Sequence, residues 1–148
     1  MSILQSAGVQ LTKASPELVV LAYTVSEELA QIHGVLHGGI SAAIAEEAAS
    51  IGATKSAANG FIALGAAIES HHLRPVPIGT SCEARAFPEA PGGRLQVWRV
   101  EQRITSTGDL FNVSTVSLYL KKAPAECVSQ EPARSYPDSC HHVSAARS

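Results

Sequence analysis

The sequence contains no long hydrophobic run and no block of like charges. No apolar stretch approaches the roughly 20 residues that a helix needs to span a bilayer. The 11 basic and 13 acidic residues are spread along the chain and give a net charge of -2, which offers no basic surface for a nucleic-acid backbone. With 148 residues, 45% of them hydrophobic, the chain can form one domain with its own core. We therefore expect a soluble globular protein that neither spans membranes nor binds nucleic acids.

Cysteine is also scarce, and its spacing argues against two structural roles. Cys82, Cys127 and Cys140 are odd in number and have no close spacing, so the sequence predicts neither a disulfide framework nor a zinc site. The cytoplasm or another reducing compartment fits this pattern best. The residues after Met1 show no signal-peptide or transit-peptide pattern, and the last three residues are not the peroxisomal Ser-Lys-Leu signal.

Hydrophobic patterning predicts a hairpin followed by one helix. A β-branched segment at 17–25 and an earlier strand near 9–13 flank a Ser-Pro turn, which indicates an opening hairpin. An alanine-rich helix is expected over 40–58, because Gly39 precedes it and Asn-Gly follows it. Its small apolar side chains on most sides suggest that this helix is buried.

Four more strands are expected after the helix, at 61–73, 80–87, 94–105 and 110–120. Alternate residues of the last two share one face: Trp98, Val100, Gln102 and Ile104, then Ser114, Val116, Leu118 and Leu120. This order predicts an α+β fold in which an antiparallel sheet wraps around one helix. The proline- and serine-rich segment 123–148 predicts a disordered tail, so the domain is expected to cover residues 1–122.

Two adjacent glutamates, Glu46 and Glu47, interrupt the apolar helix. A buried carboxylate without partners is costly, and burial raises the pKa of a carboxyl group toward the range of a general base. Successive helical residues point about 100° apart, so the two side chains serve different faces. Glu46 shares its face with Ser50, one turn further on. Glu46 is therefore a candidate base, with an ion pair at a subunit interface as the alternative.

Gly38 and Gly39 stand where a helix start leaves backbone N–H groups free. Glycine lets a ligand approach such donors, which suit a carbonyl oxygen that gains negative charge. An ordinary turn is the alternative. His33 and His37 are four residues apart, but the glycines around them disfavour a rigid helical metal site, and we predict no metal.

Three segments together resemble a known family. They are Gln31-x5-His37-Gly38-Gly39-x6-Glu46-x3-Ser50, HHLRP and GGRLQVWRV. They resemble the hotdog-fold acyl-CoA thioesterases, in the branch that includes 4-hydroxybenzoyl-CoA and 1,4-dihydroxy-2-naphthoyl-CoA thioesterases. The resemblance covers residues 8–122. It implies hydrolysis of an aromatic acyl-CoA to the free acid and CoA, without a cofactor beyond the CoA of the substrate.

The resemblance also implies a role for each matched residue. Glu46 would be the base or nucleophile at the thioester, and Ser50 would hold the water beside it. The backbone N–H of Gly38 would polarise the thioester carbonyl. Gln31 would lie near that carbonyl, and His37 would support the turn.

Binding of the substrate is implied for four further residues: His72, Arg74, Gly93 and Arg94. Arg74 matches a phosphate-binding arginine, and Gly93-Arg94 falls on a loop that contacts the nucleotide. The segments VLHGGISAAIAEEAASIGA and LQVWRVE are most similar to the 1,4-dihydroxy-2-naphthoyl-CoA enzymes, where His72 would match a pocket histidine. His71, however, replaces an asparagine common in that group, and Arg74-Pro75-Val76 is more similar to the 4-hydroxybenzoyl branch.

Assembly is implied as well. Two hotdogs of this family join edge to edge, each active site takes residues from both, and the dimers often pair into tetramers. We therefore expect a homo-oligomer whose small-molecule partner is an acyl-CoA. Two other functions on the same fold stay open at this point: a non-catalytic acyl-CoA-binding protein, and a dehydratase or hydratase.

Overall fold

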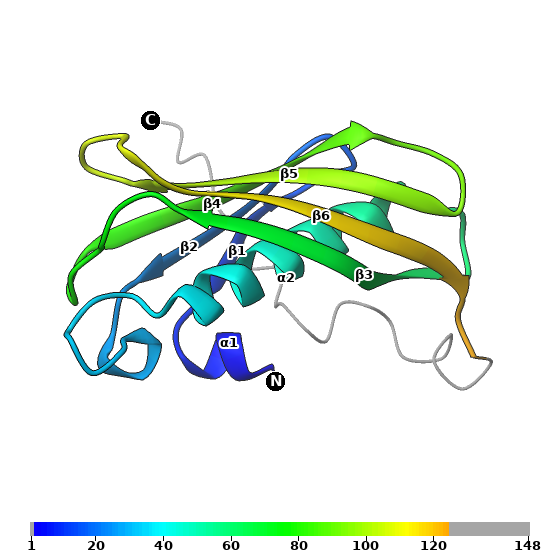
Figure 1. Cartoon of the computed structure of the whole chain (residues 1–148). Coiled ribbons are helices and arrows are strands. Elements are labelled where there is room, and N and C mark those ends of the chain that lie inside the picture. Colours follow the sequence, from blue (N-terminus) through cyan, green and yellow to red (C-terminus); the bar gives the residue numbers. More distant parts are fainter. Residues whose placement is uncertain (1, 125–148) are drawn as a thin grey trace, which may run out of the picture.

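A computed structural model describes residues 2–124 (Figure 1). Its elements are α1 (Ile3–Ser6), β1 (Gln10–Ala14), β2 (Val19–Thr24), the 3-10 helix η1 (Glu27–Leu29), α2 (Gly38–Ser56), β3 (Phe61–His72), β4 (Ser81–Ala90), β5 (Leu95–Ile104) and β6 (Leu110–Lys122). The strands form one antiparallel sheet in the order β1-β2-β4-β5-β6-β3. The sheet curves around α2, as Figure 1 shows. The predicted tail lies outside the described residues except for its first two.

The predicted fold class and order of elements are confirmed, with small differences at the boundaries. Helix α2 begins at Gly38 rather than Ile40, because Nδ1 of His37 accepts a hydrogen bond from the Gly39 N–H at 2.9 Å and caps the helix. Strand β4 continues past Phe87 to Ala90, and a register shift after Pro88 accommodates that proline within the strand. The short helices α1 and η1 were not predicted.

Small residues let α2 approach the sheet closely. The buried residues of the helix are Ser41, Ile44, Ala45, Ala48, Ala49, Gly52 and Ala53. A Cβ atom at Gly52 would overlap the indole ring of Trp98, which is fully buried. The Trp98 Nε1–H donates to Oε1 of Gln96 at 2.8 Å. The glycine therefore makes room for the largest side chain of the core.

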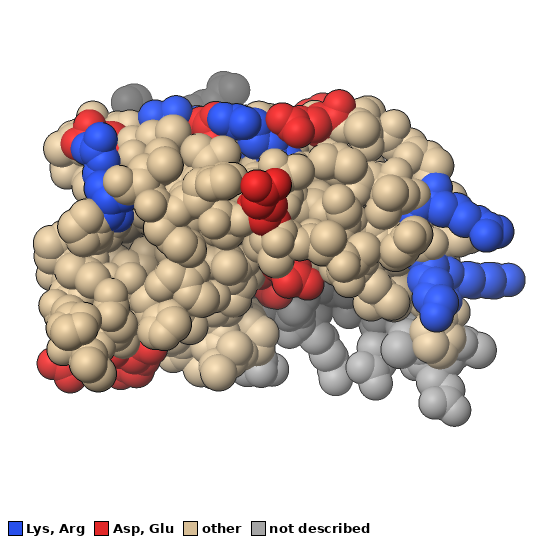
Figure 2. Space-filling view, in the orientation of Figure 1, with Lys and Arg blue, Asp and Glu red and all other residues tan. Residues whose placement is uncertain are grey.

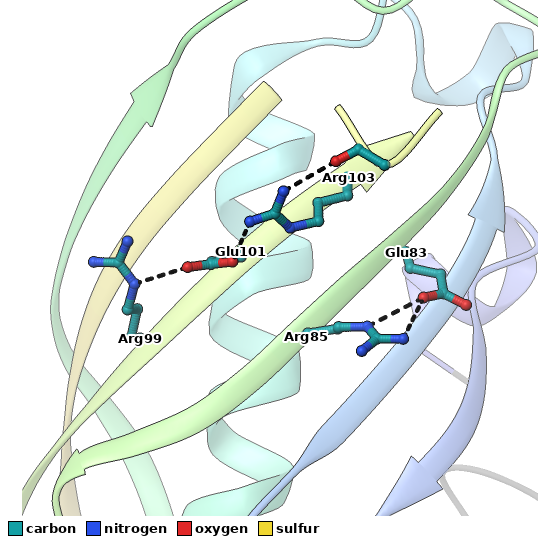
Figure 3. A network of polar contacts seen from close by, with 6 residues as sticks. Glu83, Arg85, Arg99, Glu101 and Arg103 are labelled. Carbon is teal, nitrogen blue, oxygen red and sulfur yellow. Dashed lines mark hydrogen bonds and ion pairs between the residues drawn. The ribbon is translucent and has the colours of Figure 1, made fainter. Parts of the chain in front are cut away.

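Charged pairs cover the face of the sheet that points away from α2 (Figure 3). On β4, Arg85 donates to Glu83 through Nε and Nη2, both at 3.2 Å. On β5, Glu101 accepts from Arg103 at 2.8 Å and from Arg99 at 3.1 Å. The hydrogen bond from Arg103 is the main reason why the pKa of Glu101 lies below its usual range, and Arg99 adds to the effect.

Strand β3 forms one edge of the sheet, since it pairs only with β6. Its exposed side chains include Phe61, Leu64 and Ile68, which are 39%, 46% and 38% exposed. Edge strands with exposed apolar side chains are usually covered by association. No helix within residues 2–124 is long and apolar enough to cross a bilayer.

Candidate active site

A cavity of about 380 Å³ opens where the start of α2 meets the end of β3. Four residues predicted from the sequence line it together: Gln31, Gly38, His72 and Arg74. Ser41 and Phe111 are further lining residues that the sequence did not indicate. The structure thus brings four of the nine predicted site residues together around one cavity, from segments 31–41 and 72–76.

Gly38 lies directly against His72 in the lining of this cavity. A Cβ atom at position 38 would lie 2.9 Å from Nε2 of His72, so any larger residue would collide with the imidazole. Among the hydrogen bonds of residues 2–124, none engages the Gly38 N–H. The neighbouring Gly39 N–H is taken by His37, whose side chain is exposed and does not line the cavity. The free Gly38 N–H at a helix start can donate to an anionic oxygen.

Glu46 lies outside this cavity. It comes eight positions after Gly38, which is about 12 Å along a helix. Its side chain is exposed, so the expectation that this carboxylate is buried was wrong for a single chain. The reason is that Glu46 faces β3, and beyond this edge strand nothing in the described chain covers it. Ser50 follows one turn later and is half-buried, as is Glu47.

The Glu46 carboxylate instead contacts Gly65 of β3, where a Cβ atom would overlap Oε1. Gly65 also lines a second, larger hollow of about 730 Å³. Three basic residues border this hollow: Arg94, Lys121 and Lys122. Figure 2 shows basic side chains gathered at the end of the molecule where β6 ends. The predicted catalytic carboxylate is therefore next to a cationic hollow.

The two arginines predicted to bind CoA lie in different hollows. Arg74 lines the first, and its Nη1 lies 3.4 Å from Oδ2 of Asp109. Arg94 lines the second, together with two lysines. Gly93 precedes Arg94 in the loop before β5 and has a φ of 70°, a conformation that favours glycine. Neither hollow is lined by both arginines.

A group of buried polar side chains behind His72 was missed by the sequence reasoning. Its members are Tyr23, Gln102, Asn112 and Ser114, all within the core. Burial raises the pKa of Tyr23 well above its ordinary value, and the nearby Cys82 adds to this, so the hydroxyl stays protonated. One signal in the sequence could have indicated this group: Gln102 and Ser114 are polar, yet they lie on strand faces that were otherwise predicted to be apolar.

The histidines do not form a metal site in the described chain. No cluster of three or more His, Cys, Asp or Glu side chains within residues 2–124 is arranged to hold a metal ion. His71 points away from His72, as successive strand residues do, and its Nε2 lies 3.1 Å from Glu69. His72 is thus the one of this pair that belongs to the cavity.

A curved antiparallel sheet around one helix, with a glycine-bordered cavity at the helix start, is the hotdog architecture. The chain belongs to the thioesterase superfamily, whose model matches residues 33–110. That range contains Gly38, Glu46, His72 and Arg94. The family predicted from the sequence motifs is thereby confirmed.

Individual relatives support this class. The chain is 40% identical over 103 residues to 1,4-dihydroxy-2-naphthoyl-CoA thioesterase 2 of Arabidopsis thaliana, covering 65% of this chain and 64% of that protein. It is 33% identical to a 1,4-dihydroxy-2-naphthoyl-CoA hydrolase of Listeria monocytogenes, covering 82% and 98%. A thioesterase structure from Haemophilus influenzae matches with a TM-score of 0.76 and 30% identity, covering 82% and 83%.

Proposed function

We propose that this chain hydrolyses an aromatic acyl-CoA, and that 1,4-dihydroxy-2-naphthoyl-CoA is its substrate. The free N–H of Gly38, which borders a cavity of about 380 Å³, is the observation that carries the proposal. A thioester carbonyl bound there develops negative charge as it is attacked, and a backbone donor stabilises that charge. The two relatives that are named for this naphthoyl-CoA support the choice of acyl group.

Glu46 supplies the second half of the chemistry. As a base, its carboxylate takes a proton from water while the water oxygen attacks the carbonyl carbon. The C–S bond then breaks, and the CoA thiolate leaves and is protonated. As a nucleophile, the carboxylate attacks the carbonyl carbon, the C–S bond breaks and the CoA thiolate leaves and is protonated, and water then hydrolyses the resulting anhydride to the free acid and the Glu46 carboxylate. Both routes need Glu46 within reach of the carbonyl, and Ser50 on the same face of α2 would hold the water.

Two chains are needed to bring these groups together. Gly38 and Glu46 of one chain lie about 12 Å apart along α2. Glu46 faces the β3 edge, which carries the exposed apolar residues Phe61, Leu64 and Ile68. We therefore propose that a second copy pairs at β3, so that Glu46 of one chain meets Gly38, Gln31 and His72 of the other. Pairs of such dimers would form the tetramer.

The CoA phosphates would bind at the cationic hollow. Arg94, Lys121 and Lys122 surround it, and each is exposed and able to donate to a phosphate. Gly93 would let the pyrophosphate approach the backbone of the loop. In the first hollow, Arg74 is already paired with Asp109 and would add a weaker contact. No cofactor is proposed beyond the CoA of the substrate.

A reducing compartment is proposed as the location. Cys82 is buried and has a free thiol, and burial raises its pKa to about 11. A thiol of this kind is neither paired nor reactive, as in proteins of reducing compartments.

A panel of acyl-CoAs tests the proposed function. Purified protein is mixed with 1,4-dihydroxy-2-naphthoyl-CoA, 4-hydroxybenzoyl-CoA, a straight-chain acyl-CoA and a β-hydroxyacyl-CoA, and a thiol reagent reports free CoA. We expect the highest kcat/KM with the naphthoyl substrate. Binding without release of CoA would instead indicate a non-catalytic binding protein, and a preference for the straight-chain substrate would contradict the aromatic assignment.

A further inference from the structure

A chain of hydrogen bonds crosses the core from Tyr23 on β2 toward the cavity. The Tyr23 hydroxyl donates to Oε1 of Gln102 at 2.7 Å. Nε2 of Gln102 donates to the carbonyl oxygen of Ser41 at 2.8 Å and to Oδ1 of Asn112 at 3.0 Å. Gln102 and Asn112 are completely buried. Because a backbone carbonyl can only accept, the Ser41 contact fixes which end of the Gln102 amide carries the protons.

The orientation of Gln102 then fixes that of Asn112. Oδ1 of Asn112 accepts from Gln102, so its Nδ2 must face the other way. Nδ2 lies 2.9 Å from Oγ of Ser70 and 3.0 Å from Nδ1 of His72. The two amide protons thus go to two acceptors, and one of these is a ring nitrogen. Nδ1 of His72 can accept only if it carries no proton.

We propose that Asn112 and Gln102 are positioning residues that hold His72 as the neutral tautomer protonated on Nε2. We propose further that this Nε2–H donates, beside the Gly38 N–H, to the thioester carbonyl oxygen. This inference rests on the proposed function, because it assigns a second donor to the same carbonyl. The close approach of Nε2 to Gly38, 2.9 Å from the position of a Cβ atom there, puts both donors at one point of the cavity.

The surroundings of His72 favour this neutral donor. The cavity lining contains no carboxylate, and the charged side chain beside His72 in it is that of Arg74. Asp109, the nearest acid in that direction, is paired with Arg74 at 3.4 Å. On β3 the Glu69–His71 pair points to the opposite face of the strand, and Glu46 of the same chain lies two helical turns from Gly38. No anion of the described chain therefore contacts His72 and draws a proton onto Nδ1.

His72→Gln and His72→Asn form a matched pair that tests the donor. Glutamine is long enough to place an amide N–H near the position of Nε2, whereas asparagine reaches only as far as Nδ1. We expect His72→Asn to lower kcat about 10²-fold, as loss of one donor to an oxyanion does, with KM nearly unchanged. His72→Gln should keep most of the wild-type kcat. Equal losses in the two variants, or a loss confined to KM, would overturn the proposal.

Asn112→Asp tests the positioning role, because a carboxylate at this position accepts a hydrogen bond instead of donating one. Long-range ¹H–¹⁵N correlations in the ligand-free protein distinguish the two neutral tautomers of His72. We expect the proton on Nε2 in the wild type and on Nδ1 in Asn112→Asp. The kcat of Asn112→Asp should fall below that of wild type, since Nε2 then carries no proton to donate to the carbonyl oxygen.

The two tests separate this inference from the proposed function. A wild-type ring protonated on Nδ1, or an Asn112→Asp variant whose kcat equals that of wild type, would overturn the positioning role. If Asn112→Asp does not fold, the tautomer of the wild-type protein still tests the positioning role. The variants His72→Gln and His72→Asn, at an exposed position, still test the donor. Wild-type protein that hydrolyses no acyl-CoA would contradict the proposed function, whereas the tautomer is measured without substrate.

Discussion

The carboxylate of Glu46 lies directly against the backbone of Gly65, in the edge strand β3. There is no room for a side chain at position 65 while Glu46 keeps this conformation. The contact connects the helix to the edge where we propose that a second copy pairs. It also gives three ways to test the role of Glu46.

Glu46→Ala should lower kcat at least 10²-fold, in the range typical for loss of a general base. Glu47→Ala is the matched control, because the neighbouring carboxylate points to a different face of α2. Its effect on kcat should be mild. Steady-state kinetics on the best substrate of the panel provides the measurement, and equal losses in the two variants would remove the assignment to Glu46.

Gly65→Ala should lower kcat through Glu46, because the added methyl group displaces the carboxylate. A double-mutant cycle measures this coupling. In the Glu46→Ala background, where the carboxylate is absent, Gly65→Ala should have almost no further effect on kcat. If the two losses in kcat simply multiply, the methyl group acts elsewhere on the edge strand.

Mixed oligomers test the shared site. Glu46→Ala and Gly38→Pro should each be inactive: the first lacks the carboxylate, and the second lacks the N–H and collides with His72. In a mixed dimer one of the two sites is intact, so equal amounts refolded together should recover about a quarter of wild-type activity. Light scattering that shows an active monomer, or a mixture as inactive as its parents, would contradict the shared site.

Arg94→Ala should raise KM more than Arg74→Ala does. Phosphate contacts are made in the ground state and the transition state alike, so kcat should change little in either variant. Arg94 shares its hollow with Lys121 and Lys122, whereas Arg74 is paired with Asp109. Kinetics at low and high salt should show a smaller salt dependence of KM in Arg94→Ala. A larger increase in KM for Arg74→Ala than for Arg94→Ala would indicate instead that the phosphates bind in the first hollow.

Glu101 should make folding stability fall in acid. Its folded pKa is lowered, chiefly by the hydrogen bond from Arg103. Stabilisation by the ionised form is therefore present above the ordinary glutamate pKa of about 4.3 and is lost as the pH falls through the lowered value. Urea unfolding at about pH 6 and about pH 3 should show a smaller loss for Glu101→Gln than for wild type. Glu17→Gln, at an exposed position, is the control: its loss of unfolding free energy between the two pH values should equal that of wild type.

The sequence by itself determined the elements and the family. The alternating pattern of β5 and β6 and the alanine-rich run of α2 are local signals, because a strand repeats every two residues and a helix every 3.6. The motif from Gln31 to Ser50 carried the thioesterase assignment for the same reason, since its residues are close in the chain.

Only the tertiary structure decided where the functional groups lie relative to one another. The strand order places β3 at an edge, and this leaves Glu46 exposed although most residues of its helix are small and apolar. Tyr23 and Gln102 meet across 79 residues of sequence, and Asn112 and His72 across 40. Such contacts come from the pairing of distant strands, whose register is set by burial in the whole sheet rather than by local residue patterns.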